Sequence, residues 1–399
     1  MTEVFTGNFT QQEPISDEAI EAAVSVMRSG RLHRYNVGEG EAGEVALLEQ
    51  EFATYMGSKF CLAVSSGGYA IATALRALGV APGEPVLTNA FTLAPVPGAI
   101  ASTGGVPVFV GVTEGLVIDL PDLETKIKAT GSRILLLSHM RGHICGMDDL
   151  MMLCNALEVQ VIEDCAHTMG ARWNGVLSGR HGVMAAYSTQ TYKHLNSGEG
   201  GLLISDDPDL MAKATMLSGS YMLFERHLAA PSPEYFTETK YHTPNISGRM
   251  DHLRAAILRV QLRDLDQQCK RWNERYLVVE EELQDTTGMT LIARPKAEAY
   301  VASSFQFLLL DWSEAAIDDV VQRCLARGVE LKWFGGAEPA GFTSRYDSWR
   351  YAPSEPMPES DRVLKGILDL RLPLTFTLDD CAQIARIIKA EVSAVHQAG

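Results

Sequence analysis

Three groups of residues have types and spacing that could together support one kind of chemistry. Asp164 ends the segment VQVIED, and Lys193 follows 29 residues later, after a second apolar run. Gly67 and Gly68 lie upstream, between a strand-like and a helix-like segment. A lysine can form a Schiff base with an aldehyde cofactor, an acid can keep a pyridinium nitrogen protonated, and a helix that starts after a glycine turn can bind a phosphate. The three groups therefore predict a site for pyridoxal 5'-phosphate.

Each group also has an ordinary structural explanation. An aspartate at the end of a strand commonly caps a helix or anchors a loop, and most lysines are solvated surface groups. Glycines at a strand-to-helix turn commonly allow close packing. The order of the three groups along one chain is what favours the cofactor site. Burial of the lysine would lower its pKa toward use as a base.

The segment from residue 60 to 205 has the pattern of a parallel α/β sheet, because short apolar runs alternate with helical patterns. We expect helices at 69–78 and 148–157. Ligands of such sheets bind beyond the carboxyl ends of the strands, so Asp164 is expected to face the site. The expected strands lie in the segments KFCLAVSS, EPVLTNA, VPVFVGV, SRILLLSH, VQVIED, GVMAAYS and GGLLISD.

The second half of the chain begins with a long irregular segment and continues into a smaller unit. Residues 219–248 contain prolines and little periodicity, which predicts a lid or a subunit contact. A helical pattern runs from 249 to 283, and strand and helix patterns follow from SSFQFLLLDW onward. We therefore expect a large catalytic domain over residues 1–265, with a mainly parallel central sheet flanked by helices, and a small α+β domain over residues 266–399.

Composition argues against several classes of protein. The formal charge is −16 and is spread along the chain, so a nucleic-acid partner is not expected. The N-terminal segment lacks a basic region followed by an apolar one, and no window reaches about 18 uninterrupted apolar residues, so we expect neither export nor a membrane span. The seven cysteines are scattered without a C-x-x-C pair, which predicts free thiols of a cytoplasmic protein and no metal site.

Five segments, in order, resemble the motifs of the DegT/DnrJ/EryC1/StrS sugar aminotransferases: AVSSGGYAIATAL, TNAFTLAPVPGAI, VIEDCAHTMGA, YSTQTYKHLNSGEGGLLISDD and GRMDHLRAAILRVQL. They lie within residues 60–262, and flanking patterns extend the resemblance to nearly the whole chain. The resemblance implies the fold-type-I pyridoxal phosphate fold and a homodimer with its active site at the interface. It also implies transfer of an amino group from glutamate or glutamine to a keto or aldehyde sugar.

The resemblance implies roles for individual residues. Lys193 would form the Schiff base, and Asp164 would bind the pyridinium nitrogen. Phe91 would stack on the cofactor, and His167 would lie over its ring. The phosphate would be bound by Ser188 and by the glycine turn, which consists of Gly67, Gly68 and Tyr69.

Two positions depart from the family pattern. Where the family has Ser-Gly-Thr, this chain has Ser66-Gly67-Gly68, so backbone amides or a second subunit must replace a hydroxyl ligand of the phosphate. Where the family has Asn-Tyr-Arg, this chain has Ser247-Gly248-Arg249. In one branch a histidine replaces the lysine and the enzyme is a sugar dehydratase. Here Lys193 keeps the aminotransferase spacing to Gly198, and His194 lies one position further along.

Two cationic clusters, in SGRLHRYN and HMRGHICG, predict an acidic substrate, although such groups can equally be solvated on the surface. The segment around Lys193 and the segment LKWFGGAEPAGFTSRYDSWRYAP most resemble the branch that aminates C8 of a free 3-deoxy-octulosonate sugar. We therefore expect L-glutamate as donor and the 8-oxo form of 3,8-dideoxy-manno-octulosonate as acceptor, for lipopolysaccharide biosynthesis. A nucleotide-linked keto-hexose is the alternative acceptor, and a pyridoxal-fold regulator is the alternative from another class. The expected substrate contacts are Arg31, His33, Arg34, Arg141 and His143.

Overall fold

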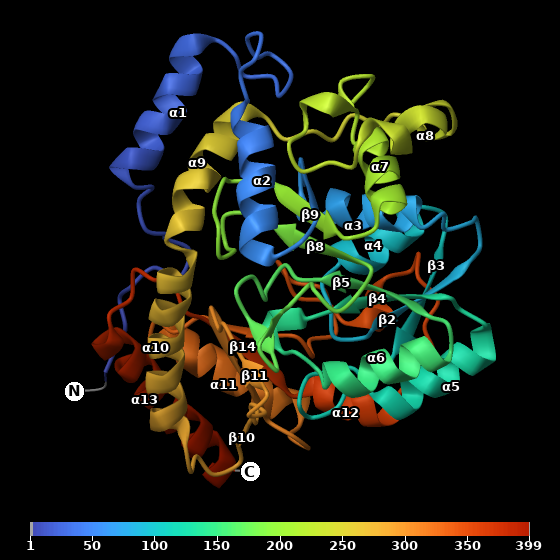
Figure 1. Ribbon diagram of the computed structural model, residues 1–399. Coiled ribbons are helices and arrows are strands. Elements are labelled where there is room, and N and C mark those ends of the chain that lie inside the picture. The colour runs from blue at the N-terminus through green and yellow to red at the C-terminus, as the bar shows by residue number, and fades with distance from the viewer. Residues whose placement is uncertain (1–2, 399) are drawn as a thin grey trace.

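A seven-stranded sheet forms the centre of the larger part of the molecule (Figure 1). The computed structural model describes residues 3–398. The strand order is β1-β9-β8-β5-β4-β2-β3, and β9 is the one strand that runs antiparallel to its neighbours. All seven predicted strands are present, so the expected mainly parallel sheet is confirmed. Their bounds are β1 Phe60–Val64, β2 Pro85–Asn89, β3 Val106–Val110, β4 Ile134–Ser138, β5 Gln160–Asp164, β8 Met184–Ser188 and β9 Gly201–Ser205.

Helices cover both faces of this sheet. In β4, Ile134 and Leu136 belong to one hydrophobic core, whereas Leu135 and Leu137 belong to another on the opposite face. A strand buried on both faces has no polar side, which is why β4 reads as an uninterrupted apolar run. The first core includes α3 (Gly67–Ala77), α4 (Pro95–Ser102) and α7 (Pro208–Leu217), and the second includes α2 (Glu44–Met56), α5 (Leu120–Thr130) and α6 (Met147–Ala156).

The start of α3 has a local cause that bears on the site. Ser66 is the N-cap, and its side-chain oxygen accepts a hydrogen bond from the backbone N–H of Tyr69. The helix therefore begins at Gly67, two residues earlier than predicted, because the cap lies before the glycine pair. The predicted helix at 148–157 is observed as α6, shifted by one residue at each end.

The segment 219–248 is more structured than the prediction of a long loop. It contains the 3-10 turns η2 (Phe224–Arg226) and η3 (Pro233–Tyr235) and the short helix α8 (Phe236–His242). The ring of Phe236 is buried and stacks on that of Phe224, with centroids 4.1 Å apart. Aromatic stacking of this kind supplies local packing that a proline-containing sequence pattern does not reveal.

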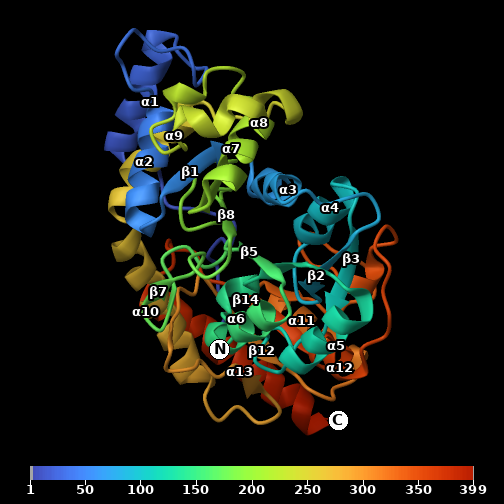
Figure 2. The ribbon, with the colours of Figure 1, turned by 45° about the vertical axis from the view of Figure 1, so that its right-hand side comes forward.

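The helical pattern predicted from 249 to 283 is two helices, not one. The helix α9 (His252–Arg263) ends and α10 (Leu265–Leu283) begins around Asp264, whose ψ angle of 4° is not helical. Aspartate competes with helical backbone bonds and is a weak helix former, which allows the break. Along one side of the molecule, α9 packs against α1 (Asp17–Ser29) and α2, as both views show (Figures 1 and 2).

A second sheet, of antiparallel strands in the order β10-β12-β14-β13, forms the centre of the C-terminal unit. Its core also contains Phe5 and Phe9 from the N-terminal end of the described chain. The predicted strands and the predicted helix after Ser313 are present, whereas the domain division at residue 265 stays a prediction. The remaining bounds are β10 Thr290–Leu291, β12 Ser304–Leu308, β13 Leu331–Trp333, β14 Ile367–Arg371, α11 Glu314–Ala326, α12 Pro358–Lys365, α13 Leu378–Ala398, η1 Met140–Gly142 and η4 Tyr346–Ser348.

A third, small sheet, in the order β11-β6-β7, joins residues from both halves of the chain. Its strands are β6 (Arg172–Trp173), β7 (Val176–Leu177) and β11 (Glu298–Ala299). Across residues 3–398, the structure contains no helix with the length and apolar character that a bilayer span requires.

Candidate active site

The carboxyl ends of the parallel strands bring the predicted chemical groups together. Asp164 ends β5, Ser138 ends β4 and Ser188 ends β8, while Lys193 lies in the connection from β8 to β9. These four residues line one inner cavity of about 80 Å³. The cavity also contains Gly67 and Gly68 at the start of α3 and the ring of His167. The residues that the sequence grouped together therefore meet at one edge of the sheet.

Asp164 is buried at the inner end of this cavity. Its carboxylate accepts hydrogen bonds from the hydroxyl of Ser138 at 3.0 Å and from the backbone N–H of Ala166 at 3.1 Å. Burial raises the pKa of Asp164, while these hydrogen bonds and the charge of Lys193 oppose the shift. A buried acid held by fixed donors is suited to binding a protonated ring nitrogen.

Lys193 is half-buried beside the buried ring of His167. Its Nζ lies 2.6 Å from Nε2 of His167. Burial lowers the pKa of Lys193 to about 7, and the positive charge of Arg141 acts in the same direction. The pKa of His167 is also well below its usual range, because the ring is buried and faces cations. A neutral imidazole can therefore accept from the lysine, and the lysine amine is available as a nucleophile near neutral pH.

The glycine turn is shaped for a phosphate. A Cβ on Gly67 would lie 2.8 Å from Cβ of Ser188, so a larger residue would close this end of the cavity. A Cβ on Gly68 would meet only Pro95, at 3.7 Å, so space remains where the family carries a hydroxyl. The first N–H groups of a helix lack intrahelical partners and attract anions. The residues present thus fit pyridoxal 5'-phosphate, with an acid, a lysine and an anion cradle in one cavity.

Two predicted cofactor contacts have other places in the structure. The N–H of Tyr69 donates to the Ser66 cap, and its hydroxyl donates to Leu217 O at 3.1 Å, so Tyr69 anchors the segment after α7. Phe91 is buried in a hydrophobic core, edge-on to Phe334. Leu93, two residues further on, lines the cavity instead. Because β2 ends at Asn89, the path of the following loop decides which of these side chains faces the cavity. Phe91 therefore does not line the inner cavity, where the resemblance places it.

An outer cavity of about 350 Å³ opens from the inner one and shares Lys193 and His167 with it. Its lining includes the cations Arg141, Lys332 and Arg371, together with the aromatic residues Tyr192 and Phe342. Sequence reasoning identified Arg141 but missed Lys332 and Arg371, which come from strands of the C-terminal unit. The available signal was charge inside apolar strand segments, in GVELKWF and ILDLRLP.

Four predicted substrate contacts do not reach either cavity within this chain. Arg31 pairs with Glu41 on the surface, and His33 is exposed beside Tyr35. Arg34 is buried and pairs with Glu49 at 3.0 Å, and Glu49 also accepts from the N–H of Ala63 in β1. His143 is buried and bonds to Gln306 at 2.8 Å. Glu49 thus joins α2 to β1, and the guanidinium of Arg34 is engaged in balancing its buried charge.

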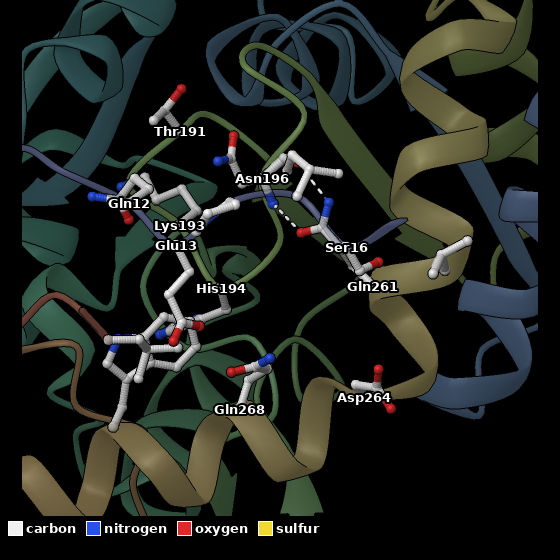
Figure 3. Close-up of a pocket in the computed structure, with 15 residues that line it drawn as sticks. Gln12, Glu13, Ser16, Thr191, Lys193, His194, Asn196, Gln261, Asp264 and Gln268 are labelled. Atoms are coloured by element: carbon white, nitrogen blue, oxygen red, sulfur yellow. Dashed lines mark hydrogen bonds between the residues drawn. The ribbon is translucent and has the colours of Figure 1, made fainter. Parts of the chain in front are cut away.

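A third, small cavity of about 150 Å³ lies on the other side of the Lys193 segment (Figure 3). There, the backbone N–H of Asn196 donates to the side chain of Gln261 at 2.9 Å, and the Gln261 amide donates back to Asn196 O at 2.7 Å. His194 is buried against Trp272, and burial lowers its pKa to about 3. These contacts fix the segment that carries Lys193 onto α9.

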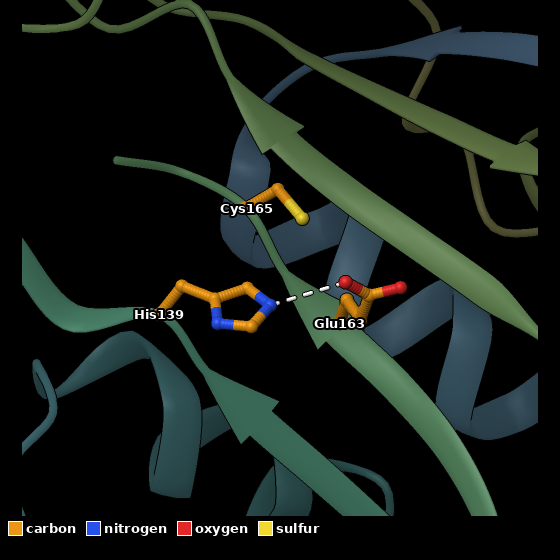
Figure 4. A group of neighbouring side chains, drawn as sticks. All are labelled: His139, Glu163 and Cys165. Carbon is orange, nitrogen blue, oxygen red and sulfur yellow. Dashed lines mark hydrogen bonds and ion pairs between the residues drawn. The ribbon is translucent and has the colours of Figure 1, made fainter. Parts of the chain in front are cut away.

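One buried cluster has the residue types of a metal site. His139, Glu163 and Cys165 place their ligand atoms within 4.8 Å of one another (Figure 4). The carboxylate of Glu163 already accepts from His139 and from the backbone N–H groups of Gly179, His181 and Gly182. This carboxylate therefore holds the loop after β7 against β5, next to Asp164.

The lowered pKa of Lys193 predicts how cofactor capture depends on pH. Only the neutral amine attacks an aldehyde, so protein freed of cofactor should bind pyridoxal phosphate about tenfold faster for each pH unit up to about 7, then level off. Stopped-flow absorbance measures this rate, with N-acetyl-lysine in the same buffers as the control for titration of the cofactor itself. A protein rate that still rises tenfold per unit between about pH 8 and 10 would contradict the shift.

Comparison with known proteins is consistent with this site. Residues 14–389 match the model of the DegT/DnrJ/EryC1/StrS aminotransferase family. The chain is 30% identical to the pleiotropic regulatory protein of Geobacillus stearothermophilus, over 66% of this chain and 65% of that protein. It is 31% identical to the dTDP-3-amino-3,4,6-trideoxy-alpha-D-glucose transaminase of Streptomyces venezuelae, over 71% of this chain and 69% of that enzyme. The aligned part thus spans about two thirds of the length of these relatives.

A solved structure shows the same fold over the whole chain. The crystal structure of 3-amino-5-hydroxybenzoic acid synthase superposes with a TM-score of 0.82 and covers 98% of this chain and 99% of its own. Its sequence identity is 23%, so this similarity shows the fold alone. The expected fold class is confirmed.

Proposed function

We propose, since the chain belongs to the DegT/DnrJ/EryC1/StrS aminotransferase family, that it is an enzyme that transfers an amino group from L-glutamate to a carbonyl sugar with pyridoxal 5'-phosphate as cofactor. One observation supports this function most strongly. Lys193 Nζ lies 2.6 Å from His167 Nε2, in a cavity that also contains Asp164 and the glycine turn.

The residues of the cavity have separate roles in this proposal. Lys193 would hold the cofactor covalently and, once released, would carry a proton on Nζ. His167 would orient that nitrogen, and Asp164 would keep a proton on the ring nitrogen of the cofactor. Ser188 and the N–H groups of Gly67 and Gly68 would hold the phosphate. When bound, pyridoxal phosphate supplies the electron sink that makes the α-proton of the donor acidic.

Lys193 separates this proposal from one alternative, and turnover separates it from another. A sugar dehydratase of the family has a histidine in place of the lysine, and here the adjacent His194 faces the cavity on the other side of the segment. One relative is named a pleiotropic regulatory protein, and a regulator that binds the cofactor without turnover is the second alternative. Such a regulator would hold the cofactor through the same lysine, so formation of 2-oxoglutarate from glutamate is the measurement that separates it from the enzyme.

For the acceptor, we propose a free acidic keto sugar, the 8-oxo form of 3,8-dideoxy-manno-octulosonate, and a role in lipopolysaccharide biosynthesis. The support is the sequence around Lys193 together with the cations Arg141, Lys332 and Arg371 in the outer cavity. Such cations stabilise a sugar carboxylate. A nucleotide-linked keto-hexose is the second candidate, because one relative is a dTDP-sugar transaminase and phosphates also bind to cations.

A comparison of the two acceptors tests this choice. The holoenzyme is given L-glutamate and either the 8-oxo octulosonate or a dTDP-linked 4-keto-hexose, and 2-oxoglutarate and amino sugar are measured by mass spectrometry. We expect both products with the octulosonate and neither with the nucleotide sugar. The reverse result would overturn the proposed acceptor, while the proposed aminotransferase activity would stand. Absence of product with any carbonyl sugar would overturn the function.

We also propose a cytoplasmic homodimer. The segment after α7 carries five exposed apolar side chains, which are each 40% to 74% exposed: Tyr221, Met222, Leu228, Tyr241 and Ile246. A subunit contact through this segment would remove them from water. In mass photometry, a fully active monomer at catalytic concentration would contradict the dimer. The location is supported by the seven buried free cysteines, which suit a reducing compartment.

A further inference from the structure

Lys332 is a cation without an anion at the wall of the outer cavity. Its Nζ is buried and has no hydrogen-bond partner anywhere in residues 3–398. It lies on β13, beside Asp369 of β14 in the strand register, yet the two side chains form no ion pair. Burial lowers the pKa of Lys332 to about 8. An ammonium group that is removed from water without a partner is unfavourable, so this position favours a bound anion.

Arg371 is the second uncompensated cation of the cavity. It ends β14, opposite Ser304 of β12, and its guanidinium lies 3.7 Å from the centre of the Tyr192 ring. Among the described residues, no carboxylate lies within ion-pair distance of it. Stacking on tyrosine orients the flat guanidinium and leaves its N–H edge free for a ligand.

Arg141 differs from these two cations because its charge is already balanced. Its Nη2 pairs with Asp369 at 3.0 Å, and its backbone has a positive φ of 55°, which is uncommon outside glycine. Asp369 also accepts from Gln306 at 2.7 Å, and Gln306 in turn accepts from His143. These linked contacts hold the Arg141–Asp369 pair in place, and the pair is nearly neutral. Within the described part of the chain, Lys332 and Arg371 are therefore the cations of the cavity wall without an ion-pair partner, and the one carboxylate of the lining outside this pair, Glu199, is exposed to solvent.

We propose that Lys332 and Arg371 form a carboxylate subsite, which binds one carboxylate of the amino donor and then the carboxylate of the acceptor. This rests on the proposed function. In a ping-pong reaction the donor leaves before the acceptor enters, so both use the same cavity and the same cations. One point charge and one planar fork fit a carboxylate.

Glutarate tests the subsite apart from turnover, because it has two carboxylates and no amino group. Calorimetry measures its binding to the holoenzyme, to Lys332→Met and to Arg371→Met. We expect each variant to bind glutarate at least about tenfold more weakly. Lys365 is exposed at the end of α12 in the same unit, so Lys365→Met is the matched control and should bind as the wild type does.

Two further variants separate charge from folding. Lys332→Arg should recover part of the glutarate affinity that Lys332→Gln loses, and circular dichroism should show equal folding. In turnover with glutamate, Lys332→Met and Arg371→Met should each raise KM much more than they lower kcat. Unchanged glutarate affinity in Lys332→Met would overturn the subsite. If dTDP bound more tightly than glutarate, and the same variants lost dTDP binding, the subsite would be one for a diphosphate and the carboxylate proposal would be overturned.

Failure of the subsite and failure of the function give different results. If glutarate binding depends on Lys332 but the protein forms no amino sugar, the subsite stands and the proposed function is overturned. If Lys332→Met forms amino sugar with a wild-type KM for glutamate, the function stands and the subsite is overturned.

Discussion

Lys193→Ala is expected to abolish transamination, with a loss in kcat of about 10⁴-fold or more. The side chain lines the inner cavity and its Nζ contacts Nε2 of His167 at 2.6 Å, so its removal takes away both the covalent attachment and the proton carrier. No other lysine lines the inner cavity, so within the described chain no amine can replace it there. Formation of 2-oxoglutarate from glutamate, in the presence of the acceptor, measures the loss.

The fold should survive this substitution. Within the described residues, the Lys193 side chain makes one hydrogen bond, to His167, and the segment is held by the Asn196–Gln261 contacts. Its lowered pKa also indicates that the folded state pays for burying the amine. The melting temperature should therefore be unchanged or raised. Lys296→Ala, at an exposed lysine, is the matched control and should retain full activity. More than trace turnover in Lys193→Ala would refute the role.

Asp164→Asn is expected to keep bound cofactor and to lose about 10² to 10⁴-fold in kcat. Removing one member of a buried charge pair costs about 3–5 kcal/mol, and each factor of ten in rate corresponds to about 1.36 kcal/mol. The amide keeps the size of the side chain and one acceptor, for the N–H of Ala166, and its NH2 group can donate to the Ser138 hydroxyl. It has no charge to hold a proton on the cofactor ring. Steady-state kinetics give the loss, and absorbance of the purified protein gives the cofactor content.

A second aspartate provides the control for this change. Asp119 is the N-cap of α5, and asparagine caps a helix about as well, so Asp119→Asn should leave kcat unchanged. Ser138→Ala should have an intermediate effect, because it removes one of the two donors to Asp164 and keeps the charge. Near-normal kcat in Asp164→Asn would exclude the acid from the reaction.

The sequence by itself was sufficient for the central sheet and for the placing of Asp164 and Lys193 at one edge of it. All seven strands lie where apolar runs predicted them, because burial on both faces leaves a continuous local signal. Asp164 and Lys193 follow strand ends in the sequence, and parallel strands place such ends at one edge of the sheet. Their proximity follows from the topology, and the topology follows from the alternation of strands and helices.

Only the tertiary structure decided which side chains reach the cavities. Leu93 lines the inner cavity in place of Phe91, since the direction of a side chain after the end of a strand depends on the turn of the loop. Arg34 lies in the core against Glu49 because the contact partner is chosen by packing between distant elements.

The lining of the outer cavity depends even more on the tertiary structure. Lys332 and Arg371 come from two strands of the C-terminal unit and reach a lysine more than a hundred residues earlier in the chain. Their positions depend on how one sheet is placed against another, which no local pattern of apolar and charged residues encodes. Local periodicity specifies elements, whereas the contacts between elements specify which charges remain unpaired beside the site.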